Sequence, residues 1–245
     1  MNRTKIEWVR NPDGSQGYTA NPVKGYCPMA CPYCYARRMY DRFGWDKTIR
    51  FNAIKTVDEL ASIKKPSRIF WGSTMELFGT WIEDRWLKHI FHMVELTPQH
   101  THIFLTKRPE NLVKWSPFPE NCWVGVSATN DNMALEAMLI LPKIEAKVKF
   151  ISFEPLHSAI TLPVAVSLNL GSFHYPLEWL DWLIIGSETG NRKEKPPLSE
   201  VHKWAKEIIA AADEAGIPVF LKDNLKWPVV RREFPKCQSL TIPQA

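Results

Sequence analysis

Short runs of consecutive hydrophobic residues recur along the chain, each with the length and composition of a buried β-strand. Continuous apolar runs of this kind are typical of parallel strands that are covered on both faces. Six of them lie at residues 68–72, 102–106, 122–126, 148–152, 182–186 and 218–222. The segment from Thr19 to Gly25 predicts one more strand before them. Amphipathic segments between the runs predict helices over residues 84–96, 130–141 and 199–215.

This alternation of strands and helices predicts an α/β fold. The expected strands number about seven, near the eight of a closed (β/α) barrel. We therefore expect a single domain over residues 1–245, built as a partly open, parallel, TIM-like (β/α)6–7 barrel. Residues 163–176 show no helical stripe, so an irregular excursion is expected there.

Composition narrows the setting of the protein. The chain has 245 residues, of which 45% are hydrophobic, and this suffices for one large core. No apolar run is long enough to cross a bilayer, which predicts a soluble protein without a membrane partner. Five cysteines, an odd number, without a signal peptide indicate a reducing cytoplasm.

The strongest chemical signal is a run of three closely spaced thiols. Cys27, Cys31 and Cys34 form a C-x3-C-x2-C pattern in a loop over residues 25–36. Three thiolates can hold a [4Fe–4S] cluster and leave one iron with an open coordination position. Structural zinc, the main alternative, requires four nitrogen or sulfur ligands and would need a histidine from the stretch that contains His89, His92, His100 and His102. A disulfide is disfavoured by the reducing compartment.

Polar residues follow nearly every predicted strand. In a parallel barrel the positions just beyond the carboxyl ends of the strands line the reaction chamber. The candidates, in chain order, are Ser73, Thr74, Glu76, Lys107, Arg108, Ser127, Asn130, Glu154, Glu188 and Lys222. For each acid or base among them, a salt bridge across the mouth of the barrel is an equally good explanation.

The cysteine run, with Tyr33 before its last thiol, resembles the radical S-adenosylmethionine (SAM) superfamily. Other segments resemble the phage-associated three-cysteine-motif family, a domain of unknown function. They cover essentially the whole chain and include Ile6-Glu7-Trp8, Cys34-Tyr35-Ala36, Thr106-Lys107-Arg108-Pro109, Ser152-Phe153-Glu154-Pro155 and Gly186-Ser187-Glu188-Thr189-Gly190.

The resemblance implies a barrel of the radical SAM type and an enzyme of lyase or transferase type. Such an enzyme reductively cleaves SAM to a 5′-deoxyadenosyl radical, with an electron from a donor such as flavodoxin or ferredoxin. The implied roles are cluster ligation by Cys27, Cys31 and Cys34; adenine contact by Tyr33; binding of the methionine amino group by Ser73, Thr74 and Glu76; binding of its carboxylate by Lys107 or Arg108; ribose contact by Ser127 and Asn130; and catalysis on substrate by Glu154, Glu188 and Lys222.

The expected substrate class is nucleic acid, with DNA favoured and base modification or repair as the reaction. Residues 24–50 contain six basic and two acidic residues, a net charge of +4 against +5 for the whole chain. Phosphates could follow Arg37, Arg38 and Arg42, although a solvated helix face explains such charge as readily. Tryptophans among basic residues can stack on bases, whereas core packing is the better explanation for Trp71.

Two alternatives remain open for the function. The enzyme could act on a peptide or a small metabolite, or the protein could be a non-catalytic metal- or iron–sulfur-binding module. Of the two remaining cysteines, Cys122 is expected in the core, and Cys237 could reach the chamber as a hydrogen-atom donor.

Overall fold

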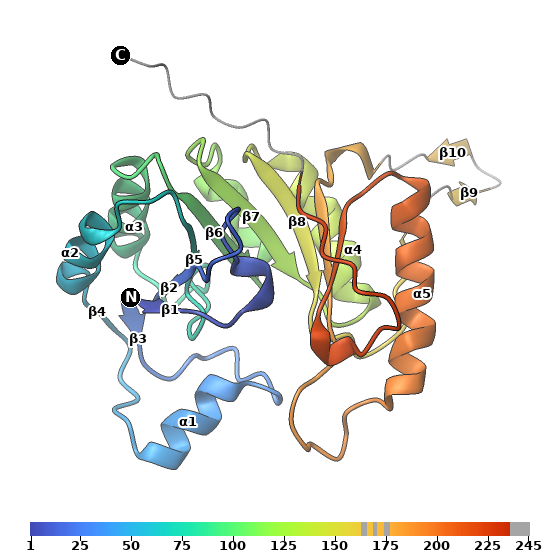
Figure 1. Ribbon diagram of the computed structural model, residues 1–245, viewed down its shortest axis with the longest axis horizontal. Helices are drawn as coiled ribbons and strands as arrows, with labels where there is room; N and C mark the ends of the chain where they lie inside the picture. The colour runs from blue at the N-terminus through green and yellow to red at the C-terminus, as the bar shows by residue number, and fades with distance from the viewer. Residues whose placement is uncertain (163–165, 169–170, 174–176, 236–245) are drawn as a thin grey trace.

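A computed structural model describes residues 1–162, 166–168, 171–173 and 177–235, and it shows a single mixed α/β domain (Figure 1). Within this part of the chain, eight strands form one sheet in the order β1-β2-β5-β6-β7-β8-β11-β12. Only β1 is antiparallel to its neighbour. The strands are β1 (Asn2–Arg3), β2 (Tyr18–Ala20), β5 (Arg68–Trp71), β6 (Thr101–Thr106), β7 (Cys122–Ser127), β8 (Val148–Phe153), β11 (Trp182–Ile185) and β12 (Val219–Leu221).

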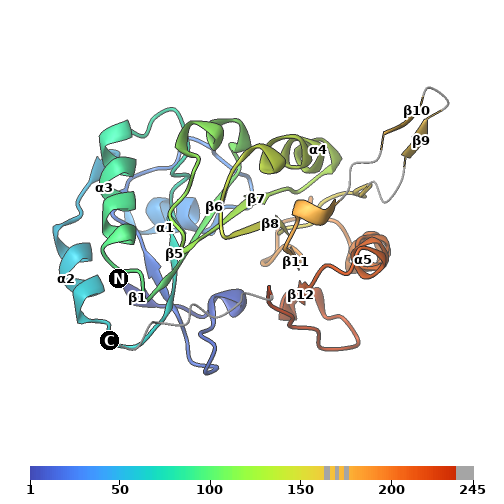
Figure 2. The ribbon, with the colours of Figure 1, turned by 90° about the horizontal axis from the view of Figure 1, so that it is seen from above.

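Helices cover the outer face of the sheet. The α-helices of the described residues are α1 (Tyr35–Phe43), α2 (Ile54–Ser62), α3 (Asp84–Glu95), α4 (Asp131–Ile140) and α5 (Leu198–Glu214). Seen from above, α3, α4 and α5 follow one another along one side of the sheet (Figure 2). Residues such as Leu87, Ile90 and Val94 recur at helical spacing on α3, and they pack with alternate strand residues in one apolar outer core.

The inner face of the sheet is lined by aromatic rings and covered by the start of the chain. Phe70, Phe150, Trp182 and Phe220 point inward from four different strands and form an inner core with Trp8. Trp8 belongs to the 3-10 turn η1 (Glu7–Val9), and its ring centroid lies 4.9 Å from that of Phe70 and 6.5 Å from that of Trp182. The N-terminal segment therefore fills the inner face.

The described strands do not close into a barrel. β1 and β12 are the two edges of the sheet, and no pairing between them is present in the described part of the chain. The expected, mostly parallel sheet is thus confirmed, and its strands follow one another in chain order. The described strands do not form the closed ring of a complete barrel.

The hydrophobic runs coincide with β5, β6, β7, β8, β11 and β12, and the predicted helices coincide with α3, α4 and α5. The prediction of one strand from Thr19 to Gly25 was wrong. The segment divides at Pro22 into β2 and β3 (Val23–Lys24), and β3 pairs with β4 (Arg50–Phe51) in a separate small sheet. Proline has no N–H for a central ladder, which explains the break.

The remaining elements are short. The predicted excursion contains β9 (Val166–Leu168) and β10 (Gly171–Phe173), which pair antiparallel, and its other residues lie outside the described part. The other 3-10 turns are η2 (Pro109–Asn111), η3 (Val113–Trp115), η4 (Leu141–Lys143), η5 (Leu177–Trp179) and η6 (Asp223–Leu225). None of the described helices combines the length and apolar composition needed to cross a membrane.

Candidate functional site

The inner face of the sheet changes from aromatic to polar at the carboxyl ends of its strands. On β8, Phe150 lies in the inner core, and the alternation of a strand brings Ser152 and then Glu154 to the same side. Ser127 of β7 is the register partner of Ser152, and both serines are almost fully buried. The hydroxyl of Ser152 has no hydrogen-bond partner in the described part of the chain. A buried donor without a partner is available to a ligand.

Two of the three predicted catalytic residues lie together at this polar end. The ammonium group of Lys222 forms an ion pair with Glu154 Oε1, and the indole Nε1–H of Trp8 donates to Glu154 Oε2 over 3.4 Å. Gly186 lies beside them, and a Cβ at this position would be 3.0 Å from Lys222 Cδ and 3.4 Å from Glu154 Cγ. The absence of a side chain at Gly186 therefore gives the ion pair its space.

The third, Glu188, lies in a different network. Its carboxylate accepts two hydrogen bonds from Arg192, at 2.9 and 2.8 Å, and it contacts His157 Nε2 at 2.8 Å. The hydrogen bonds from Arg192 hold the pKa of Glu188 below its usual range. The ring of Tyr33 packs edge-on against His157, with centroids 5.1 Å apart. Glu188 thus connects the end of β11 to the cysteine loop.

The cysteine loop, residues 25–36, is anchored to α1 and to the loop after β5. Arg37 of α1 donates to the Cys27 carbonyl over 2.6 Å, and the Tyr40 hydroxyl accepts from the Gly25 N–H over 2.8 Å. Cys34 is the N-cap residue of α1, and Tyr35 donates to the carbonyl of Ser73 over 3.2 Å. The loop therefore lies at the carboxyl-end side of β5.

The thiols of Cys27, Cys31 and Cys34 are all free. The backbone N–H of Glu76 donates to Cys27 Sγ over 3.5 Å, while burial raises the pKa of Cys27. Burial, together with the nearby thiols of Cys31 and Cys34, raises the pKa of Tyr33.

The donor set fits an iron–sulfur cluster by its chemistry, because three free thiols on one loop, one of them accepting from a backbone N–H, are what such clusters use. In this conformation, however, no three His, Cys, Asp or Glu residues of the described part converge into a metal-binding group. Among these residues there is accordingly no four-ligand zinc site around the loop either.

Glu76 is a buried carboxylate that joins β5 to β6. Its Oε1 accepts from the Thr106 hydroxyl at 2.6 Å and from the Phe78 N–H at 3.0 Å, and its Oε2 accepts from the Lys107 N–H at 2.7 Å. Three of its acceptor positions are therefore occupied by the protein itself. The sequence places Glu76 at the site, but it does not indicate this bracing role.

We expect Glu76→Ala to destabilise the protein by about 3 kcal/mol, because Thr106, Lys107 and Phe78 would each lose a buried acceptor. Urea unfolding followed by circular dichroism measures the change. Glu136→Ala, an exposed position on α4, is the matched control and should lie within about 0.5 kcal/mol of the wild type. An equally small effect for Glu76→Ala would contradict the bracing role.

Asn21, which the sequence analysis did not single out, organises the loop after β5. Its Oδ1 accepts from the Ser73 hydroxyl, the Thr74 N–H and the Thr74 hydroxyl, each at 3.2 Å, and its Nδ2 donates to Ser73. The hydroxyls of Ser73 and Thr74 are therefore both directed to this amide. The Asn21-Pro22 break between β2 and β3 is the only local signal that could have indicated Asn21.

The remaining candidates have mixed environments. Asn130 caps α4, since its Oδ1 accepts from the Met133 N–H at 3.0 Å, so its side chain has a structural partner. Arg108 Nε lies 2.9 Å from Glu110 Oε1. Lys107 is half-buried; its backbone N–H donates to Glu76, and its ammonium group has no ion pair in the described part.

Cys122 begins β7 and is fully buried, as predicted, and burial raises its pKa. Trp71 is also a core residue, as predicted, with its indole bound to His102. Cys237 lies outside the described residues.

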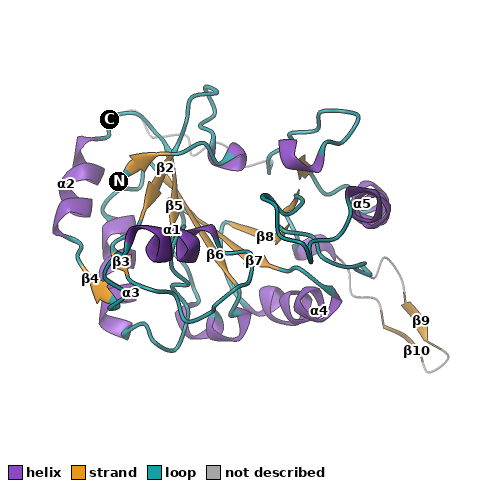
Figure 3. Ribbon diagram, turned by 90° about the horizontal axis from the view of Figure 1, so that it is seen from below, coloured by secondary structure: helices purple, strands orange, loops and turns teal. Residues whose placement is uncertain are grey.

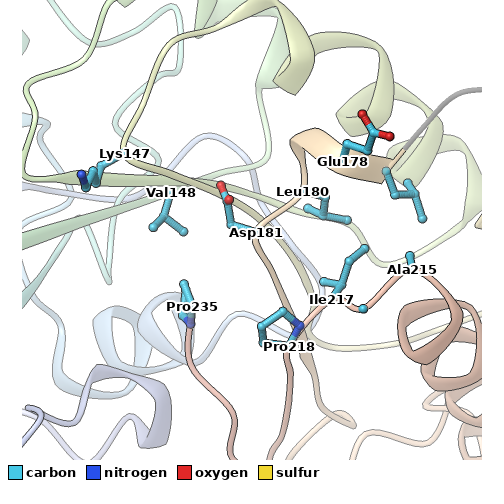
Figure 4. Close-up of a pocket in the computed structure, with 11 residues that line it drawn as sticks. Lys147, Val148, Glu178, Leu180, Asp181, Ala215, Ile217, Pro218 and Pro235 are labelled. Carbon is cyan, nitrogen blue, oxygen red and sulfur yellow. The ribbon is translucent and has the colours of Figure 1, made fainter. Parts of the chain in front are cut away.

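A pocket of about 460 Å³ opens at the opposite end of the sheet (Figure 4). Val148, at the start of β8, and Pro218, just before β12, line it together with Asp181. Burial raises the pKa of Asp181, but its carboxylate already accepts from the Lys149 N–H at 2.7 Å. Since the candidate residues gather at the carboxyl ends of the strands, this pocket is not part of the site.

Comparison with known proteins gives one family. The sequence profile of a family described as "Protein of unknown function (DUF5131)" matches residues 3–238. No curated protein and no solved structure matches the chain.

Proposed function

The chain belongs to the DUF5131 family, and we propose that it is a radical SAM enzyme that modifies or repairs a nucleic-acid base. One observation carries this proposal: three free thiols lie on a single loop beside the carboxyl end of a parallel strand, in a sheet whose strands follow chain order. In this interpretation the sheet is a partly open barrel of the radical SAM type. Its chamber is the polar end of the inner face.

Cys27, Cys31 and Cys34 would hold a [4Fe–4S] cluster. When bound, this cluster together with SAM supplies a 5′-deoxyadenosyl radical, after reduction by a donor such as flavodoxin or ferredoxin. Tyr33 supports the assignment because it lies in the same loop, close enough to Cys31 and Cys34 for these thiols to affect its pKa, while its ring packs against His157. Glu188 then acts as a positioning residue for Tyr33 through His157, whereas the sequence suggested direct catalysis.

Groups with unused hydrogen-bonding capacity are the best candidates for binding SAM and substrate. Ser127 and Ser152 offer buried hydroxyls next to each other, and Ser152 has no protein partner in the described residues. Lys107 offers a carboxylate an ammonium group that forms no ion pair within the described residues. Glu154 and Lys222, paired with each other, are suited to orient the reacting part of a substrate.

Other candidates need rearrangement before they could contact SAM. Glu76 retains little acceptor capacity, and Asn130 is occupied as a helix cap. Ser73 and Thr74 can each exchange their hydrogen bond to Asn21 for one to a ligand.

The experiment is anaerobic reconstitution with iron and sulfide, followed by a reductant and SAM. We expect slow formation of 5′-deoxyadenosine and methionine without added substrate. Ser127→Ala should raise the SAM concentration for half-maximal cleavage by at least about fivefold, since a buried hydrogen bond of about 1–3 kcal/mol is removed. Ser199→Ala, at an exposed position on α5, is the matched control.

Full iron loading without any 5′-deoxyadenosine would contradict the proposal and indicate a non-catalytic iron–sulfur module. Cleavage of SAM with no detectable nucleic-acid binding would favour a peptide or metabolite substrate. If Ser127→Ala needs the same SAM concentration as the wild type for half-maximal cleavage, the cofactor binds away from the polar end of the inner face.

A further inference from the structure

Helix α1 presents an uncovered aromatic face. Tyr35, Met39, Phe43 and Trp45, called the α1 face below, are 50, 38, 53 and 46% exposed, although all are large and apolar. In Figure 1 the helix lies below the sheet and apart from α2 and α3, and in Figure 3 it lies in front of the strands. Such a concentration of exposed large apolar side chains on one short helix and the turn that follows it is typical of a binding surface.

The rings of the α1 face are arranged for stacking. Phe43 and Trp45 are parallel to within 22°, with centroids 5.4 Å apart, and Trp45 is held edge-on by the buried Tyr40. Gly44, in the left-handed conformation at φ 59°, reverses the chain between them. Both rings are thereby fixed on the surface, which lowers the entropic cost of stacking a ligand on them.

The same helix carries cationic groups with few acidic partners. Arg38 and Arg42 are exposed and form no ion pair in the described part of the chain, and Arg42 lies 5.3 Å above the Phe43 ring. The two acids of this region are already neutralised, since Asp41 pairs with Lys47 and Asp46 pairs with Arg50. The uncompensated charge of the face is therefore positive.

A hollow of about 390 Å³ adjoins Tyr35 and Trp45. Tyr35, Met39 and Trp45 form its apolar side, and Lys24 and Thr74 lie at its polar side. Thr74 belongs to the loop organised by Asn21, so a base in this hollow would lie beside the predicted cofactor residues. The hollow thus joins the α1 face to the candidate site.

We propose that single-stranded DNA binds across the α1 face, with bases stacked on Trp45, Phe43 and Tyr35 and phosphates on Arg38, Arg42 and Lys24. Ring faces stack on any unpaired base and guanidinium groups hold phosphates, and neither contact requires a ribose 2′-hydroxyl. The inference deepens the proposed function and rests on its nucleic-acid substrate.

Charge argues against the main alternative occupant, a second copy of the chain. A symmetric dimer through this face would bring Arg38 and Arg42 close to their own copies, and like charges at an interface oppose association. A polyanion compensates the same charges.

The structure also shows which arginine to leave intact in a test. Arg37, expected from the sequence to contact phosphate, donates to the Cys27 carbonyl and lies 3.6 Å from the centroid of the Tyr26 ring. Its removal would disturb the cysteine loop, so the informative pair is Arg38 and Arg42.

The test uses the full chain and a fluorescein-labelled oligonucleotide of mixed sequence with about 16 nucleotides, followed by fluorescence anisotropy. We expect Phe43→Ala with Trp45→Ala to weaken binding at least tenfold, and Trp45→Phe alone to preserve most of the affinity. Arg38→Ala with Arg42→Ala should weaken binding. It should also make the slope of the logarithm of the binding constant against the logarithm of the salt concentration less steep by about 1.4, because two phosphate contacts to a single strand are lost.

Two distant pairs serve as controls. Leu135→Ala with Leu139→Ala removes exposed apolar groups of α4, and Lys203→Ala with Lys206→Ala removes exposed charges of α5. Neither pair should change the affinity. Cleavage of SAM should be unaffected by all α1-face variants, which separates this inference from the proposed chemistry.

The proposal is overturned if single-stranded DNA does not bind at about 50 mM salt, or if the aromatic and arginine pairs behave like the controls. Tighter binding of RNA or of duplex DNA would also overturn it. So would a wild-type dimer that dissociates in the Phe43 and Trp45 variant, which would assign the face to self-association. A protein that binds DNA through α1 but carries no iron would leave this inference standing and remove the radical chemistry.

Discussion

Cys31→Ala is expected to abolish iron binding. The wild type, purified anaerobically, should carry one four-iron cluster, and the variant should carry none, because two thiolates cannot hold the cube that three cysteines of one loop can. Iron and sulfide analysis and the visible absorbance of the cluster measure the loss. Cys34→Ala should behave in the same way.

Cys122 provides the matched control for this experiment. It is free, like Cys31, but it is buried at the start of β7 and lies in the outer core. Cys122→Ala should keep its iron. Stoichiometric zinc without iron in the wild type, or an iron content of Cys31→Ala equal to that of the wild type, would refute the assignment of the loop.

Acidification from pH 7 to pH 5 is expected to reduce the free energy of unfolding by about 2 kcal/mol through His102 alone. His102 is fully buried on β6, and burial lowers its pKa to about 3. Its Nδ1 accepts from the Trp71 indole at 2.9 Å, so the neutral ring is the form that the fold uses.

The sign follows from the two protonation states. Between pH 6.5 and 3 the unfolded chain binds a proton at this histidine and the folded chain does not, so stability is lost as the pH falls through this window. His102→Asn keeps an acceptor for Trp71 and cannot titrate. It should be less stable at pH 7 but should show a shallower loss of stability down to pH 5, measured by urea unfolding at each pH. Parallel curves for both proteins would show that His102 is not the titrating group.

The strands were predictable because each is a continuous apolar run, and a parallel strand covered on both faces requires such a run. Two neighbouring residues of β5 illustrate this, since Trp71 belongs to the outer core and Phe70 to the inner core. The break at Pro22 was overlooked because Thr19 to Gly25 was treated as one element, although proline cannot donate to a ladder.

The positions of the candidate residues were predictable from the strand ends, but their partners were not. Glu76 binds Thr106, and Glu188 binds His157; the two residues of these pairs are 30 and 31 positions apart in the sequence. Such pairs depend on how neighbouring loops fold against each other, which hydrophobic periodicity does not report. Local polarity therefore identified the polar end of the sheet. It did not separate side chains whose hydrogen bonds are used within the protein from side chains with unused hydrogen-bonding capacity.

The placement of Trp8 on the inner core has a consequence for synthesis of the protein. Its ring packs against Trp182, which in turn contacts Phe220 and Phe234 near the end of the described chain. A nascent chain therefore carries Trp8 out of the ribosome long before β12 is available to shield it. Completion of this core depends on contacts between distant parts of the sequence, which form slowly. The growing polypeptide is accordingly expected to present uncovered aromatic rings to chaperones until β12 and Phe234 have emerged.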